Sequence, residues 1–215
     1  MKEMPKIDRE EMVRRKAAFL VRTEQYLSLG YDRFAAADFV SRAGGRLSGP
    51  ALDIGTGKGL TAMAMARQGL EVVSVDPDAD EQALALLLAA EAGLEDHIRF
   101  IRGDATVLPY SGGHFGCAVL VDVLHHLKDP LSVLDEAARV LRPSGIMIVA
   151  DFSPEGFELV ARVHQDEGRE HPVSGATLES AEAFLSGRGF KLTAHLSDHR
   201  HDVIVLTKMT GEGVS

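Results

Sequence analysis

Three aspartates follow or end short apolar runs in the first half of the chain, where their carboxylates could act together on one ligand. Asp53 stands two residues before a glycine-rich loop, Asp76 ends the next apolar run, and Asp104 follows the third. Burying a carboxylate is unfavourable unless it meets hydrogen-bond donors or a cation. Such groups attract an ammonium, accept hydrogen bonds from a ribose diol or an adenine amine, and repel phosphate. We therefore expect these acids to face a cationic ligand that contains no phosphate.

The loop Gly55-Thr-Gly-Lys-Gly59 narrows the choice of ligand. Alternate glycines let the backbone turn sharply and approach a ligand closely, and the helix expected after them offers unpaired N–H groups. A P-loop would need Gly at position 52 and Ser or Thr at position 59, but Leu52 and Gly59 stand there. A dinucleotide fingerprint would need Gly at position 60, which is Leu60. The loop and the acids together favour S-adenosylmethionine, and an NAD-type oxidoreductase is the alternative.

His125 and His126 follow the fourth apolar run and are candidates for acid–base chemistry. A histidine whose pKa lies near neutrality can take a proton from a hydroxyl or amine nucleophile. Adjacent residues on a helix point about 100° apart, so at most one of the two is expected to face a pocket. Packing or local hydrogen bonding is the competing interpretation for both.

A second set of histidines occurs late in the chain. With Asp198 or Asp202 nearby, some of them could form a metal site, but a polar turn at a strand end is the favoured interpretation. We therefore expect no metal. The histidines are His164, His171, His195, His199 and His201.

Apolar runs and helical patterns alternate along the middle of the chain, which predicts a doubly wound α/β fold with a mostly parallel sheet. The expected strands are Ala51–Ile54, Glu71–Val75, Ile98–Arg102, Cys117–Val121 and Gly145–Ala150. The expected helices between and after them are Leu60–Arg67, Asp80–Ala92, Pro130–Leu141, Gly156–His164 and Leu178–Leu185. Phe190–Leu196 and Asp202–Thr207 are separated by a short connection, which favours an antiparallel last strand.

Composition limits the class of protein. The 215 residues contain 32 acidic and 23 basic side chains, a net charge of −9, and one cysteine. Cys117 therefore forms no internal disulfide and is expected in the core, while Lys58 is expected to be solvated. The charge argues against nucleic acid and anionic membranes as partners. The N-terminus is charged throughout and lacks a secretory signal, so we expect a cytoplasmic protein.

Residues 44–209 resemble the class I S-adenosylmethionine-dependent methyltransferases. The resemblance rests on the LDIGTGKG segment, the acids at 76 and 104, the VLHHLKDP segment and Leu141-Arg-Pro-Ser-Gly145. It implies a seven-stranded Rossmann-like sheet and methyl transfer to a small-molecule acceptor, with S-adenosylhomocysteine as product. It also implies the cofactor-binding residues, which are Asp53, Gly55, Thr56, Gly57, Gly59, Asp76, Pro77, Asp104, Ala105, Asp122 and Val123. Asp122 joins His125 and His126 as a candidate at the acceptor end.

The N-terminal segment is expected to form a helical cap over residues 1–43. A first helix is expected to start at Asp8, where Glu11 three residues later completes a helix-start signal, and to end at Gly30. Its apolar residues are at positions 13, 17, 20, 21 and 27, and a second helix is expected to follow it. The helices could cover a sheet edge, or, as the resemblance implies, close over the cofactor with Tyr26, Tyr31 and Phe34 near the sulfonium. Residues 210–215 are expected to be a flexible tail. The oligomeric state stays open, as does a non-catalytic S-adenosylmethionine-binding protein.

Overall fold

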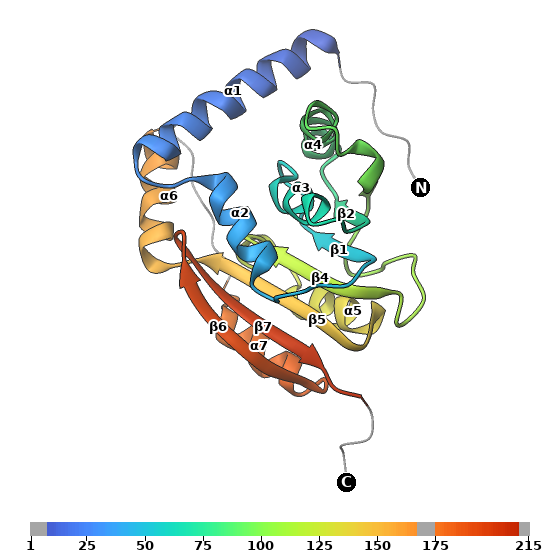
Figure 1. Ribbon diagram of the computed structural model, residues 1–215. Helices are drawn as coiled ribbons and strands as arrows, with labels where there is room; N and C mark the ends of the chain where they lie inside the picture. The colour runs from blue at the N-terminus through green and yellow to red at the C-terminus, as the bar shows by residue number, and fades with distance from the viewer. Residues whose placement is uncertain (1–7, 167–174, 211–215) are drawn as a thin grey trace.

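The computed structural model describes residues 8–166 and 175–210 around one seven-stranded sheet (Figure 1). The strand order is β3-β2-β1-β4-β5-β7-β6, and β7 runs antiparallel to both of its neighbours. The other neighbouring strands, from β3 through β2, β1 and β4 to β5, pair in parallel. This mostly parallel arrangement confirms the predicted fold class. The strands are β1 (Ala51–Ile54), β2 (Val72–Asp76), β3 (Ile98–Arg102), β4 (Phe115–Val121), β5 (Leu141–Phe152), β6 (Phe190–Asp198) and β7 (His201–Lys208).

Helices cover both faces of the sheet, as the alternation in the sequence requires. The described α-helices are α1 (Arg9–Ser28), α2 (Arg33–Arg42), α3 (Leu60–Arg67), α4 (Ala79–Glu91), α5 (Pro130–Val140), α6 (Pro154–Asp166) and α7 (Leu178–Ser186). Successive strand residues point to opposite faces, so each strand feeds two cores. Leu52 and Ile54 pack in the core with α5 and α7, whereas Ala51 packs in the core with α3. Cys117 is buried in this second core, as expected.

The observed strands are longer than the predicted ones mainly in β5, β6 and β7, the last three strands of the chain. β5 begins at Leu141 instead of Gly145, because Leu141 already pairs with Phe115 across an irregular step in the β4–β5 register. β6 and β7 both reach the turn at His199 and Arg200, whose φ values are 49° and 65°. The turn is therefore tighter than the predicted connection, and it places His201 inside a strand.

The N-terminal segment forms the two expected helices, but the first helix buries a different face from the one that carries its predicted apolar stripe. Asp32 begins α2 by accepting hydrogen bonds from the backbone N–H groups of Phe34 and Ala35. In α1, Phe19 and Tyr26 are the buried residues. The predicted apolar stripe instead faces solvent: Val13, Leu20, Val21 and Leu27 are 47–66% exposed. Aromatic rings outcompete the smaller aliphatic side chains for burial because they remove more apolar surface from water.

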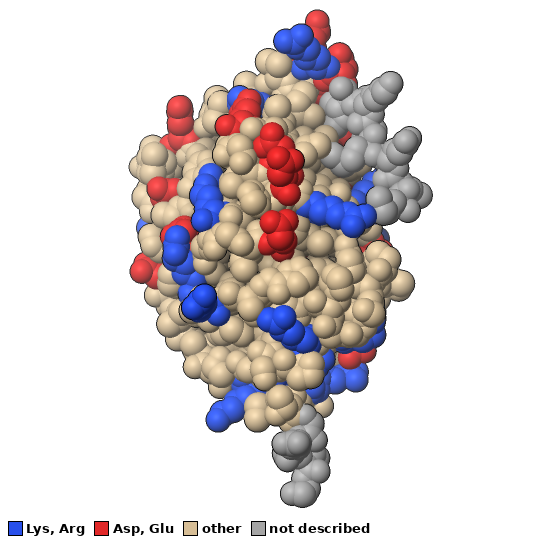
Figure 2. Space-filling view, turned by 45° about the vertical axis from the view of Figure 1, so that its right-hand side comes forward, with Lys and Arg blue, Asp and Glu red and all other residues tan. Residues whose placement is uncertain are grey.

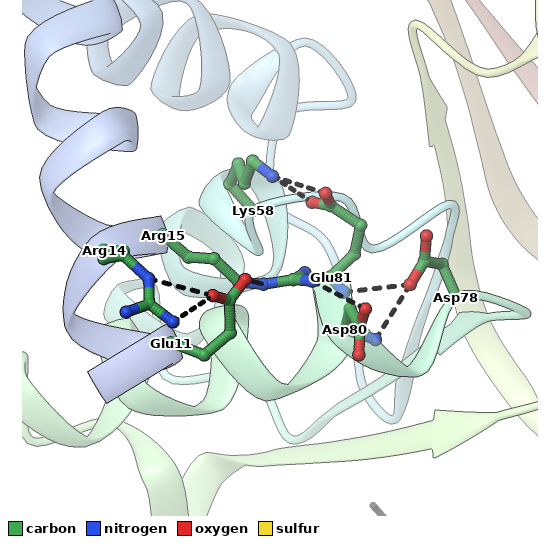
Figure 3. Close-up of polar contacts among 7 residues, drawn as sticks. All are labelled: Glu11, Arg14, Arg15, Lys58, Asp78, Asp80 and Glu81. Carbon is green, nitrogen blue, oxygen red and sulfur yellow. Dashed lines mark hydrogen bonds and ion pairs between the residues drawn. The ribbon is translucent and has the colours of Figure 1, made fainter. Parts of the chain in front are cut away.

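Helix α1 reaches from α4 to α6 and is attached at both ends (Figures 1 and 3). Near its start, Arg15 contacts Asp80 of α4 with a 2.8 Å N–O distance, and the same arginine pairs with Glu11. Near its end, Tyr26 packs with Tyr31 and with Val160 of α6. The N-terminal helices therefore stand over the carboxyl ends of the strands, where a ligand would bind in a doubly wound sheet.

Candidate functional site

A cavity of about 940 Å³ opens at the carboxyl ends of β1, β2 and β4, beneath the start of α2. It lies where β1 and β4 are neighbours, the point at which the strand order reverses and doubly wound sheets bind their ligands. Tyr31, Arg33 and Ala36 form the wall contributed by the N-terminal segment. Nine of the eleven predicted cofactor residues line it, namely Gly55, Thr56, Gly57, Asp76, Pro77, Asp104, Ala105, Asp122 and Val123.

The glycine loop contributes open backbone to this cavity. Gly55 has a φ of 86°, and a Cβ added there would lie 2.8 Å from Cγ2 of Val123. Gly57 has a φ of 46°, and a Cβ there would meet no atom within 4 Å. Both positions favour glycine because of their left-handed backbone. The free space at Gly57 is what a cofactor seated against the loop requires.

Gly59 does not line the cavity, and its conformation has another cause. It precedes α3 with a φ of 73°, and an added Cβ would lie 2.9 Å from the Cβ of Ala85 in α4. The third glycine therefore allows the start of α3 to approach α4 closely. Its place in the motif follows from packing rather than from direct contact with the cavity.

Asp53 also lies outside the cavity wall, although it was predicted to face the ligand. Its side chain is buried under the glycine loop and accepts a 2.6 Å hydrogen bond from the hydroxyl of Ser74, its register partner on β2. Ser74 in turn lies 2.6 Å from the hydroxyl of Thr56, and Gln82 donates to both Thr56 and the carbonyl of Ser74. Burial raises the pKa of Asp53 to about 7, against the lowering effect of Ser74.

Asp76 and Asp104 stand in the wall of the cavity with well-defined partners. Asp76 accepts hydrogen bonds from the backbone N–H groups of Gly57 (3.1 Å) and Asp78 (2.8 Å). Burial raises the pKa of Asp76, although these two bonds oppose the shift. The helix cap of α4 is Asp78, so Asp76 is not a capping residue. Asp104 is exposed and accepts from the backbone N–H and the hydroxyl of Thr106, which lower its pKa.

Asp122 meets a partner that the sequence analysis did not assign to it. Its φ is 53°, and its two carboxylate oxygens lie 3.0 and 3.1 Å from Nε2 of His201, which also lines the cavity. Burial is the largest single influence on the pKa of His201 and lowers it. The Asp122 carboxylate, the His199 carbonyl and the Asp151 carboxylate together raise the pKa, and the net direction is upward. The alternation of His201, Val203 and Val205 on one face of a strand was the signal that could have placed this histidine inside.

The two adjacent histidines separate as predicted, with one facing the cavity. His126 is exposed and lines it. His125 is buried, 2% exposed, and its Nδ1 lies 2.8 and 2.9 Å from the carboxylate oxygens of Asp151 on β5. The sequence analysis did not single out Asp151. The arrangement brings His126 to the candidate acceptor end and places His125 in a buried position beside Asp151, outside the cavity wall.

Other predicted residues occupy mixed positions. Tyr31 is buried in the cavity wall, but Tyr26 lies behind it and Phe34 is 42% exposed and contacts Phe19. Lys58 is not simply solvated, because its ammonium pairs with the Glu81 carboxylate at the cavity wall (Figure 3).

Within residues 8–166 and 175–210, no three His, Cys, Asp or Glu side chains gather in a way that could hold a metal ion. His171, one of the late histidines, lies outside the described residues. Among the same described residues, no helix has the length and apolar character needed to cross a bilayer.

Comparison with known proteins agrees with this geometry. Residues 52–149 match the methyltransferase domain family. The 27-O-demethylrifamycin SV methyltransferase of Amycolatopsis mediterranei (strain S699) is 34% identical over 155 residues, which are 70% of this chain and 55% of the relative. The demethylmenaquinone methyltransferase of Beutenbergia cavernae is 31% identical over 131 residues, 61% of this chain and 52% of the relative. The chain spans about half the length of these curated relatives.

The architecture is shared with more distant solved structures. The geranyl diphosphate C-methyltransferase of Streptomyces coelicolor A3(2), solved with Mg²⁺, geranyl diphosphate and S-adenosyl-L-homocysteine, superposes with a TM-score of 0.65. Its identity is 14%, over 83% of this chain and 80% of that chain, so the likeness concerns the fold. Sheet order, glycine loop and acid-lined cavity define a Rossmann-like fold of the methyltransferase type. Residues 52–149, which carry the glycine loop and the cavity acids, are similar to the methyltransferase domain of these proteins.

Proposed function

We propose that this protein transfers a methyl group from S-adenosylmethionine to a small-molecule acceptor. The observation that carries the proposal is the cavity at the β1–β4 switch point, which joins an open glycine loop to three carboxylates from successive strand ends: Asp76, Asp104 and Asp122. Its volume of about 940 Å³ suits a cofactor and part of an acceptor, since ligand sites commonly span roughly 300–1,000 Å³. When bound, the cofactor supplies an electrophilic methyl group on a positively charged sulfur.

In this proposal, different residues of the cavity wall contact different parts of the cofactor. Asp76, beside Pro77, holds the ribose hydroxyls, and Asp104, beside Ala105, holds the adenine edge. Gly55, Thr56 and Gly57 face the methionine portion from below, while Asp122 and Val123 border its positive end. Asp53 and Gly59 support the loop from behind, because neither reaches the cavity wall.

The acceptor end needs orientation and exclusion of water more than strong acid–base chemistry, because the sulfonium is already a good leaving group. His126 is our candidate for removing a proton from the acceptor, since it lines the cavity. The N-terminal cap contributes the buried ring of Tyr31 to this end of the cavity. In this proposal residues 44–209 form the cofactor-binding domain, whereas residues 211–215 of the expected tail lie outside the described residues.

A small-molecule acceptor is supported by the relatives, whose names specify a rifamycin and a menaquinone precursor. The net charge of −9 supports the same choice over nucleic acid or an anionic membrane. On the face drawn in Figure 2, basic and acidic side chains are interspersed around a large uncharged area. We place the protein in the cytoplasm.

Calorimetry with S-adenosylmethionine and S-adenosylhomocysteine tests the proposal. We expect both to bind, and Asp76→Ala to weaken both by about 1–3 kcal/mol, the cost of leaving polar partners unpaired. Asp78→Ala is the matched control, because Asp78 caps α4 and does not line the cavity. No binding of either compound at high micromolar concentration, or binding of NADH instead, would refute the proposal. Turnover with a panel of acceptors then separates an enzyme from a non-catalytic binder.

A further inference from the structure

His201 is held at both ring nitrogens in the wall of the cavity. Nδ1 lies 2.9 Å from the backbone carbonyl oxygen of His199, and Nε2 lies 3.0 and 3.1 Å from the two oxygens of Asp122. The residue is 1% exposed. The contact joins β7 to the end of β4 across 79 positions of the chain. The last strand thus reaches a residue that the proposed function places beside the cofactor.

The partners of the ring determine where its protons are. A carbonyl oxygen only accepts hydrogen bonds, so Nδ1 carries a hydrogen. An ionised carboxylate also only accepts, so Nε2 carries a second hydrogen and the ring is an imidazolium. Since neither nitrogen then has a lone pair to offer, His201 does not take a proton from an acceptor. Its contribution lies in what it does to Asp122.

We propose that His201 is a positioning residue that, as an imidazolium, holds the Asp122 carboxylate in one orientation toward the positive end of S-adenosylmethionine. The inference rests on the proposed function for its cofactor, whereas the protonation of the ring does not depend on it. Because one nitrogen spans both carboxylate oxygens, each oxygen keeps a lone pair for a donor in the cavity. A charge-assisted bond of this kind also restricts the rotation of a short side chain.

The groups around the ring are consistent with a positive charge there. The carboxylate of Asp151 on β5 raises the pKa of His201 in addition to Asp122. Asp151 also contacts Nδ1 of His125, so the same carboxyl lies near both histidine rings. Along the chain, the ring is flanked by Arg200 and Asp202, and Asp202 bonds the hydroxyl of Ser197.

Aromatic side chains from two further elements enclose the ring. Phe152 of β5 has its ring centroid 4.9 Å away, and Tyr31, between α1 and α2, lies at 5.9 Å. Burial raises the pKa of Tyr31, so this neighbour is a neutral phenol. The ring therefore has little room to rotate away from Asp122, and the position of the carboxylate depends on three separate parts of the chain.

Two measurements test the proposal, and the first needs no cofactor. In ¹⁵N NMR of histidine-labelled full-length protein at pH 7, both nitrogens of His201 should have the shifts of an imidazolium. In Asp122→Asn, His201 should lose its proton at a lower pH, because a neutral amide no longer stabilises the cation. A neutral ring in the unsubstituted protein, or a titration that Asp122→Asn leaves unchanged, would overturn the proposal.

The second measurement is a double-variant cycle on affinity for S-adenosylmethionine and S-adenosylhomocysteine. His201→Phe should weaken S-adenosylmethionine binding about ten- to a hundredfold, the usual range for one hydrogen bond to a charged group. Asp122→Asn with His201→Phe should bind no more weakly than Asp122→Asn alone. His201→Gln, which keeps a donor, should recover part of the affinity. His199→Asn, at the neighbouring turn, is the control and should bind normally.

Each outcome of this cycle has a definite meaning. Additive effects of the two substitutions, or normal binding by His201→Phe, would overturn the positioning role. If His201→Phe fails to fold, His201→Gln and the NMR titration carry the test. If the unsubstituted chain binds neither compound, the proposed function fails, and the role of Asp122 at the cofactor fails with it. An imidazolium signal at His201 in the same protein would show that the protonation of the ring was nevertheless assigned correctly.

Discussion

The buried carboxyl of Asp53 makes the stability of the unliganded protein depend on pH. Burial raises its pKa from 3.8 to about 7, so folding favours the protonated form. The stability that this preference provides is complete below about pH 4 and is lost as the pH rises through 7. A difference of this size corresponds to about 4 kcal/mol in total, of which about 3 kcal/mol is lost between pH 5 and pH 9.

Asp53→Asn removes this titration while keeping the shape of the side chain and an oxygen that can accept from Ser74. The free energy of unfolding, measured by urea denaturation at pH 5, 7 and 9, should fall more steeply with pH in the unsubstituted protein, by about 3 kcal/mol over the range. Asp96→Asn, at an exposed position, should reproduce the unsubstituted curve. Parallel pH curves for Asp53→Asn and the unsubstituted protein would refute the argument from burial.

Four further substitutions have outcomes that thermal or urea unfolding can check. Gly59→Ala should destabilise by about 2–4 kcal/mol, because it adds a left-handed backbone penalty to a 2.9 Å clash, and Gly57→Ala, which meets no atom, should lose less than half of that. His125→Ala should cost about 1–3 kcal/mol, since it leaves the buried Asp151 carboxyl without its hydrogen-bond partner Nδ1, and no measurable loss would contradict the pairing. Arg15→Ala should lower the unfolding free energy by no more than about 1 kcal/mol, because its ion pairs are partly solvated, while hydrogen exchange at the start of α1 becomes faster.

The layered fold was accessible from sequence because its signals are local. Short apolar runs bounded by turn residues predicted β1 and β3 at their observed limits, and the helix over Leu60–Arg67 was predicted residue for residue. The bounds of β5 could not be predicted in this way. Its first residues are paired only because Phe115 of β4 lies opposite Leu141, which is a property of the neighbouring strand.

The site was accessible from sequence in part. A glycine turn and an acid at the end of a strand have effects within a few residues, so nine of eleven cofactor candidates reached the cavity wall. The two exceptions lie behind the loop: the side chain of Asp53 faces Ser74 beneath it, and Gly59 packs closely against Ala85 of α4. The orientation of α1 was also decided by its neighbours, since Phe19 packs against Phe34 of α2 and Tyr26 packs against Tyr31 and α6.

The sequence by itself determined the doubly wound sheet and the antiparallel last strand, and it predicted the kind of cofactor that the strand ends can hold. These follow from spacing, from side-chain alternation and from the charge of a few residues. Only the tertiary structure decided which histidine meets which acid. His201 and Asp122 are 79 positions apart, and His125 and Asp151 are 26 apart. His201 reaches Asp122 because β7 inserts beside β5 and brings its first residue back to the carboxyl end of β4, whereas His125 reaches Asp151 because β5 pairs with β4. Both arrangements depend on packing between distant segments and leave no mark in local spacing.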